Sequence, residues 1–123
     1  QKGSDDGAAD VRLTGSIVGE VLAESIEIPA GSGIWLPKKN LKSFDVRFGI
    51  RWDLPTTYRL EARVTSFFGE ADVGSLITIK NQTSSTDRDF FDYSAGWGAY
   101  IFRIVNTSET DRTLRFLEII YDL

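Results

Sequence analysis

The chain has 123 residues and a mass of 13.7 kDa, which is enough for one domain with a single hydrophobic core. It contains no histidine, cysteine or methionine, and this excludes histidine bases, cysteine nucleophiles, disulfide bonds and metal sites built from imidazole or thiolate. The net charge of −4 and the isoelectric point near 4.8 disfavour nucleic acid as a partner, and the sequence has neither a phosphate-binding loop nor a dinucleotide-binding fingerprint.

The first segment with a clear pattern follows ten polar residues. Residues 11–23 alternate as one long β-strand, whereas typical strands have about five or six residues. One face of this predicted strand is apolar but interrupted by glycines, and it consists of Val11, Leu13, Gly15, Ile17, Gly19, Val21 and Ala23. Because interior glycines weaken an isolated strand, we expect this one to lie in a groove with narrow places.

The strongest alternation occurs in the middle of the chain, after two short apolar segments at 25–29 and 33–37. Every second residue is apolar in 44–53 and again in 58–65, and a proline-containing segment separates the two runs. The sequence therefore predicts a β-hairpin. Opposite charges favour a register with Arg51 across from Glu61, in which the outward arginines have acidic neighbours and form a solvated ladder.

Three later segments, 73–80, 99–105 and 113–121, are rich in β-branched and aromatic residues, and 106–112 is a hairpin loop. No segment has a helical period. The pattern predicts an all-β protein: a jelly-roll or immunoglobulin-like β-sandwich of seven to eight strands with a long N-terminal extension strand. Residues 1–24 then form a polar leader and the extension strand, and residues 25–123 form the β-sandwich body.

A glycine-interrupted N-terminal strand followed by a cysteine-free β-sandwich resembles the subunits of donor-strand filaments, which are pili and threads, above all the archaeal extracellular type. The resemblance implies that each subunit inserts residues 11–23 into the sheet of a neighbour, so that identical subunits form a homopolymer. The alternative is that residues 11–23 form the first strand of the chain's own sandwich and bend at Gly15 or Gly19.

Two asparagines bear on the location of the protein. Asn81 and Asn106 each begin an N-glycosylation sequon, although both segments also read as polar turns. Together with Gln1 in place of methionine, the sequons predict an extracellular, cell-surface protein with N-glycans and a removed signal peptide. Side chains that are damaged by heat are scarce, which favours a thermostable and archaeal protein, and no apolar run approaches the roughly 20 residues of a membrane-spanning helix.

Acidic side chains offer two candidate sites, and neither is favoured. Asp87, Asp89 and Asp92 are close enough in sequence to ligate calcium, but Arg88 lies among them and favours a solvated loop. Asp89 and Glu118 are a conceivable acid–base pair, yet nothing in the sequence marks either as buried or paired. We therefore expect no enzymatic activity, no cofactor and no catalytic or metal site.

Aromatic residues in predicted turns support a different class of function. Two interpretations apply to these aromatic residues: they form a platform for sugar rings, or they cap the ends of the core. The residues are Trp35, Phe90, Phe91, Tyr93 and Trp97. The function predicted first is a secreted structural subunit that forms an extracellular filament by strand insertion. The alternative is a carbohydrate- or ligand-binding β-sandwich module of a cell-surface protein, and a third possibility is an ordinary domain of a larger surface protein. The pairing partner of residues 11–23 distinguishes these three functions: a strand of a neighbouring subunit indicates the filament, and a strand of the same chain indicates one of the other two.

Overall fold

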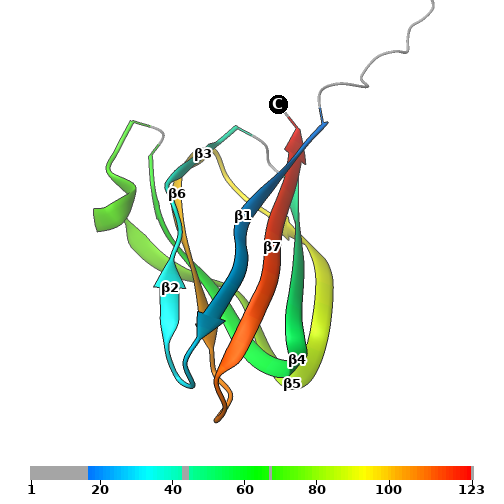
Figure 1. Cartoon of the computed structure of the whole chain (residues 1–123). Helices are drawn as coiled ribbons and strands as arrows, with labels where there is room; N and C mark the ends of the chain where they lie inside the picture. Colours follow the sequence, from blue (N-terminus) through cyan, green and yellow to red (C-terminus); the bar gives the residue numbers. More distant parts are fainter. Residues whose placement is uncertain (1–16, 43–44, 67, 123) are drawn as a thin grey trace, which may run out of the picture.

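The computed structural model describes residues 17–42, 45–66 and 68–122 (Figure 1). This part of the chain contains β-strands, one short 3₁₀ helix and no α-helix. The strands are β1 (Ile17–Ile28), β2 (Gly33–Trp35), β3 (Lys39–Leu41), β4 (Asp45–Thr65), β5 (Ser75–Ser94), β6 (Gly98–Asn106) and β7 (Arg112–Asp122), and the helix η1 covers Ala71–Val73. Among these described elements, none is a helix of the length and apolarity needed to cross a membrane.

The strands form one antiparallel sheet that curls into two layers (Figure 1). β4 and β5, with 21 and 20 residues, run through both layers. The first half of β4 pairs with β7 and with the second half of β5, and β1 lies beyond β7; we call this the first layer. The second half of β4 pairs with β6 and with the first half of β5, and β2 and β3 lie beyond β6; this is the second layer.

The hydrophobic core lies between the two layers. Phe48 of the first layer meets Phe102 of the second edge-on, with ring centroids 5.4 Å apart, and Trp52 packs on Tyr58 at 6.1 Å where β4 bends. Each such buried ring stabilises the fold by about 2–3 kcal/mol. The largest fully buried side chains are Trp52, Tyr58, Phe48, Phe102, Ile28, Leu41, Ile50, Leu60, Ile104, Leu114, Leu117 and Ile119. The predicted all-β sandwich is thus confirmed.

The predicted hairpin between 44–53 and 58–65 is wrong. β4 continues through residues 54–57 and crosses from the first layer to the second, and its hairpin partner is β5. Pro55, which has no N–H to donate, lies where the pairing of β4 with β5 is interrupted, so the proline marks a crossing and not a turn. As a consequence, Arg51 does not face Glu61.

β1 pairs along its length with β7 of the same chain, from Ile17 opposite Asp122 to Ile28 opposite Arg112. This is the arrangement of the alternative hypothesis, in which the predicted extension is the first strand of the chain's own sandwich. The positions Val11, Leu13 and Gly15 of the predicted donor strand lie outside the described residues. The boundary predicted between residues 24 and 25 falls inside β1.

The apolar face predicted for this strand, which the donor-strand interpretation places in a neighbour's groove, is mostly exposed within the chain. Ile17 and Val21 are 62% and 54% exposed, and Gly19 is exposed as well, whereas Leu22 packs against the core. Only Ala23 of this described set is buried. The pairing with β7 shifts between Val21 and Ala23, and such a bulge changes which residues face inward.

Candidate functional site

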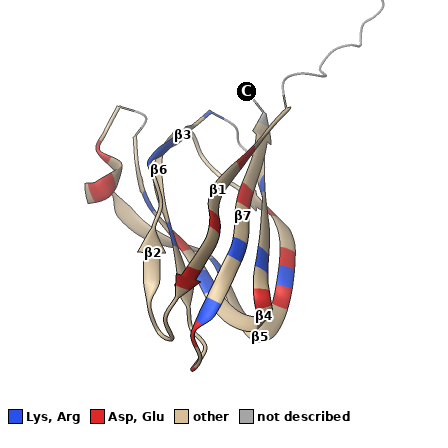
Figure 2. Ribbon diagram, viewed as in Figure 1, with Lys and Arg blue, Asp and Glu red and all other residues tan. Residues whose placement is uncertain are grey.

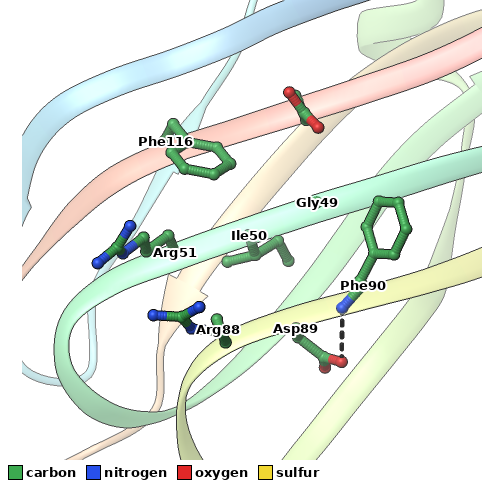
Figure 3. A pocket seen from close by; sticks show the side chains of 8 residues that line it. Gly49, Ile50, Arg51, Arg88, Asp89, Phe90 and Phe116 are labelled. Atoms are coloured by element: carbon green, nitrogen blue, oxygen red, sulfur yellow. Dashed lines mark hydrogen bonds between the residues drawn. The ribbon is translucent and has the colours of Figure 1, made fainter.

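A shallow hollow of about 350 Å³ lies on the outer surface of the first layer (Figure 3). Side chains on a strand alternate between its two faces, so Gly49 and Arg51 share the outer face of β4 while Phe48 and Ile50 are buried. The neighbouring strands β5 and β7 complete the rim. The hollow is lined by Gly49, Ile50, Arg51, Arg88, Asp89, Phe90, Phe116 and Glu118.

Gly49 forms the floor of the hollow. It lies between Phe90 of β5 and Glu118 of β7 in the register of the sheet. A Cβ atom on Gly49 would be 3.0, 3.1 and 3.4 Å from Oε2, Cγ and Cδ of Glu118, so the side chain of Glu118 lies against the bare backbone of the glycine. Glu118 has no hydrogen bond or ion pair within the described residues, which leaves both of its oxygens available as acceptors.

Two phenylalanine rings flank this floor, and Figure 3 shows Phe90 and Phe116 on opposite sides of Gly49. Phe90 is 58% exposed, and the guanidinium carbon of Arg47 lies 4.9 Å from its ring centroid. Arg47 is itself held by Asp92, with 2.6 Å between Nε and Oδ1, and this hydrogen bond keeps the pKa of Asp92 below its usual value. Phe90 therefore offers accessible apolar surface, whereas Phe116 is half-buried.

Arg51 and Arg88 lie directly opposite each other on β4 and β5, and Phe116 faces Arg51 from β7. Both arginines are exposed, and neither has an acidic partner among the described residues. Their side chains lie next to each other in Figure 3, and Figure 2 shows adjacent basic segments on the two strands. The prediction that each outward arginine has an acid in reach is wrong here, because Glu61 is bonded elsewhere, to Arg59.

The conceivable acid–base pair is not brought together. Asp89 points away from Gly49 and Phe116 in Figure 3, and its Oδ2 accepts a 2.6 Å hydrogen bond from the Tyr58 hydroxyl. Burial, followed by this hydrogen bond to Asp89, raises the pKa of Tyr58 above its usual value. Asp89 is thus a structural acceptor, and among the described residues that line the hollow Glu118 is the acidic one without a hydrogen-bond partner.

The acidic segment around Asp89 lies in strand β5 and not in a loop. Asp92 is bound to Arg47, and Asp89 to Tyr58. Within the described ranges, no three acidic residues gather in a way that would hold a metal ion. The calcium interpretation therefore finds no support in this geometry.

The five aromatic residues of the predicted platform do not form one surface. Phe90 lines the hollow, but Phe91 and Tyr93 pack against the core. Trp35 lies at the second layer, beside two arginine side chains at 5.4 Å from its ring, and Trp97 is exposed between β5 and β6.

Three features of the hollow are not predicted from the sequence: the floor at Gly49, the ring of Phe116 and the acceptor role of Glu118. A signal for Gly49 was available, since it is the only residue without a side chain among the outward positions of the alternating run 44–53. Phe116 had no such signal, because its place beside Arg51 depends on the pairing of β7 with β4.

The two predicted glycosylation sites differ in the structure. Asn106 is fully buried: its Nδ2 donates to the carbonyl oxygens of Ile28 and Thr110 at 2.9 and 2.8 Å, and its Oδ1 accepts from the Ser108 N–H at 3.0 Å. The expectation that Asn106 faces solvent and carries a glycan is wrong, because this arrangement leaves no room for one. Asn81 is exposed on β5, and its glycosylation stays a prediction.

No protein-family model and no curated protein matches the chain. Solved structures do match. The VP2 subviral particle of infectious bursal disease virus aligns with a TM-score of 0.60 and 8% sequence identity, and the alignment covers 85% of this chain and 32% of the viral chain. T=1 particles derived from this virus align with a TM-score of 0.53 and 8% identity, and the alignment covers 85% of this chain and 30% of the viral chain. CBM35 from Cellvibrio japonicus Abf62 aligns with a TM-score of 0.49 and 10% identity, and the alignment covers 85% of this chain and 97% of the CBM35 chain. The chain spans about a third of the viral proteins, and at these identities the likeness shows the fold alone, a jelly-roll-like β-sandwich.

Proposed function

We propose that the chain is a carbohydrate-binding β-sandwich module of an extracellular, cell-surface protein, and that the hollow over Gly49 is its sugar site. The observation that carries the proposal is the glycine floor between Phe90 and Phe116, with the unpaired Glu118 carboxylate beside it. A sugar ring has an apolar face of C–H groups and an edge of hydroxyls. A site for it needs an aromatic surface together with a few convergent polar groups, and this hollow supplies both.

The outer face of the first layer offers room for an extended chain of sugars. A second hollow of about 400 Å³ lies along the same face and is lined in part by the ion pair of Arg47 with Asp92. An oligosaccharide lying along the strands would place one ring over Gly49 and the next over this second hollow, because β4, β5 and β7 line both. Because such a site covers only one side of each ring, we expect a dissociation constant on the order of 0.1–1 mM per short oligosaccharide.

The test is titration calorimetry with a panel of neutral and acidic oligosaccharides. Phe90→Ala removes an exposed ring, so the fold tolerates it, and binding is expected to weaken about tenfold or more. Gly49→Val places a side chain on the floor and should block binding. Trp35→Ala is the matched control, since it removes an exposed aromatic ring outside the hollow and leaves binding unchanged. The proposal is wrong if no member of the panel binds or if Phe90→Ala and Trp35→Ala behave alike.

A filament subunit is the second candidate function. The observation that favours it is the outer edge of β1, which pairs with no other described strand and carries Ile17 and Val21 more than half exposed. Exposed apolar edge strands add strands from other molecules. Because β1 already pairs with β7, assembly would join a second copy of the chain to this edge and build a homopolymer.

Negative-stain microscopy of the purified chain tests this second candidate. Ile17→Lys and Val21→Lys place charges on the edge and should abolish filaments, whereas Val73→Lys changes an exposed apolar residue on η1 and should not. Filaments that survive both edge substitutions, or a chain that stays monomeric at every concentration, would exclude assembly through β1.

A further inference from the structure

We infer that the sugar bound over Gly49 is acidic and that Arg51 and Arg88 hold its carboxylate or sulfate group. This inference rests on the proposed function and names the class of ligand for that site. It follows from the two guanidinium groups at one end of the hollow, which lie on directly opposed positions of β4 and β5.

Arg51 and Arg88 differ from Arg47 and Arg59, which have acidic partners. Nε of Arg47 lies 2.6 Å from Oδ1 of Asp92, and Nε of Arg59 lies 2.5 Å from Oε2 of Glu61, so both arginines form ion pairs. Arg51 and Arg88 lack such a partner in the described chain, although like charges directly opposite each other destabilise a sheet. An anion bound between them would replace this repulsion with charge-assisted hydrogen bonds, and the planar guanidinium suits a carboxylate or sulfate.

No nearby acidic side chain of the described residues occupies the space between the guanidinium groups of Arg51 and Arg88. Glu118 lies one row away, opposite Gly49, and Asp89 is bonded to Tyr58. Asp87 precedes Arg88 on β5, and Glu24 of β1 faces Phe116 from the other side of β7. None of these carboxylates lies within ion-pair distance of either arginine in the described residues. The end of the hollow next to Phe116 therefore remains open to an external anion.

The spacing of the sheet sets the orientation of the ligand. Positions that share a face along one strand are about 7 Å apart, and neighbouring strands are about 4.8 Å apart. A six-membered ring over Gly49 thus lies with one edge near Glu118 and its other edge within reach of the row formed by Phe116, Arg51 and Arg88. The hydroxyls of the ring would donate to Glu118, and its acidic group would accept from the arginines.

The experiment compares ligands that differ only in charge. The probes are trigalacturonic acid and its methyl ester for the carboxylate, a sulfated disaccharide and its desulfated form for the sulfate, and sodium sulfate alone. We expect an acidic probe to bind at least about tenfold more tightly than its neutral partner, and its affinity to fall as salt rises. The pair that shows this difference identifies carboxylate or sulfate as the acidic group.

Variants assign the effect to the two arginines. Arg51→Gln and Arg88→Gln should each lower the affinity for the acidic probe about tenfold and leave the neutral probe unchanged. Lys38→Gln, an exposed charge change outside the hollow, is the control for net charge, and thermal melting checks that each variant folds.

The outcomes separate the inference from the function on which it rests. Equal binding of acidic and neutral probes, unaffected by the arginine substitutions, overturns the inference and leaves the sugar site standing. Binding of no sugar of either kind overturns the proposed function and the inference with it. Sodium sulfate that binds as tightly as the acidic sugars overturns both, because the arginines would then form a simple anion site.

Discussion

Asn106 ties the loop between β6 and β7 to two other parts of the chain. Its side chain donates to Ile28 at the end of β1 and to Thr110 in the loop. Its backbone N–H donates to the Ser32 carbonyl, and its own carbonyl accepts from Gly31 in the turn between β1 and β2. Gly31 has a φ of 74°, which favours glycine, so this turn and the buried amide hold each other in place.

Replacement of Asn106 by alanine is therefore expected to lower the free energy of unfolding by about 2–4 kcal/mol, because it leaves buried carbonyl and N–H groups without partners. Asn81→Ala, an exposed change of the same kind, should stay within about 0.5 kcal/mol. Urea unfolding measures both. Two equal effects would show that the Asn106 side chain does not make these bonds in solution.

At the scale of elements, an ion pair links the two layers at one end of the sandwich. Glu20 of β1 accepts a hydrogen bond from Lys39 of β3 and a second, at 3.2 Å, from the Tyr121 hydroxyl of β7. The hydrogen bond from Lys39 lowers the pKa of Glu20, more than desolvation raises it. Desolvation lowers the pKa of Lys39, but its bonds to Glu20 and Tyr121 raise it above the usual value overall.

The direction of the Glu20 shift predicts a loss of stability in acid. A lowered carboxyl pKa stabilises the fold above the unfolded value of about 4.3, and this contribution disappears as pH falls through the folded pKa. Glu20 is partly exposed, so solvent screening limits the contribution to about 1 kcal/mol or less. The stability difference between the native chain and Glu20→Gln should therefore shrink between pH 6 and pH 3.

Thermal or urea unfolding across this pH range makes the measurement. Glu24→Gln, on the exposed side of the same strand, is the control and should show no comparable change. A Glu20→Gln difference that stays constant with pH would mean that the ion pair does not stabilise the fold.

Elements also show what the sequence can and cannot predict. Local alternation correctly assigns the inward residues of β4, such as Phe48 and Leu60, because a buried face is a property of one strand. Pairing partners are a property of the whole sheet, so the proline near the bend of β4 predicts a turn where the strand in fact continues. The same limit hid most of the hollow, whose residues Gly49, Phe90 and Phe116 come from three strands.

The faces of β1 could not be predicted from the sequence for a different reason. Its alternation predicts one continuous face, but the bulge between Val21 and Ala23 shifts the pairing, and Ser25 adopts a φ of 53° in the same strand. Neither irregularity has a marker such as glycine or proline at its centre. A single extra residue in a strand exchanges its faces, so an unmarked bulge cannot be found from periodicity alone.

At the scale of the whole molecule, the strands differ in how far apart their partners lie in sequence. β4 and β5 are consecutive and form the largest pairing in the sheet, whereas β1 pairs with β7 from the other end of the described chain. Distant pairings form late because closing a long loop costs entropy before any contact compensates for it.

Two matched substitutions test this order of folding. Leu22 of β1 and Ile79 of β5 are both half-buried and pack against the core. We expect Ile79→Ala to slow folding, with a φ-value of about 0.5–0.8, and Leu22→Ala chiefly to speed unfolding, with a φ-value of about 0–0.3. Stopped-flow chevrons give both values. The reverse assignment would place the β1–β7 pairing in the folding nucleus.

The pairing of β1 with β7 also has a consequence for synthesis in the cell. On the ribosome β1 emerges first among the described strands, and its partner begins at Arg112, so at about 5–20 residues per second β1 waits on the order of 5–20 s. During this interval its apolar side chains, including Leu22 and Ile28, have no strand to pair with and are open to chaperones or to neighbouring nascent chains. The first layer of the sandwich, and with it the hollow over Gly49, is completed only after the last described strand has left the exit tunnel.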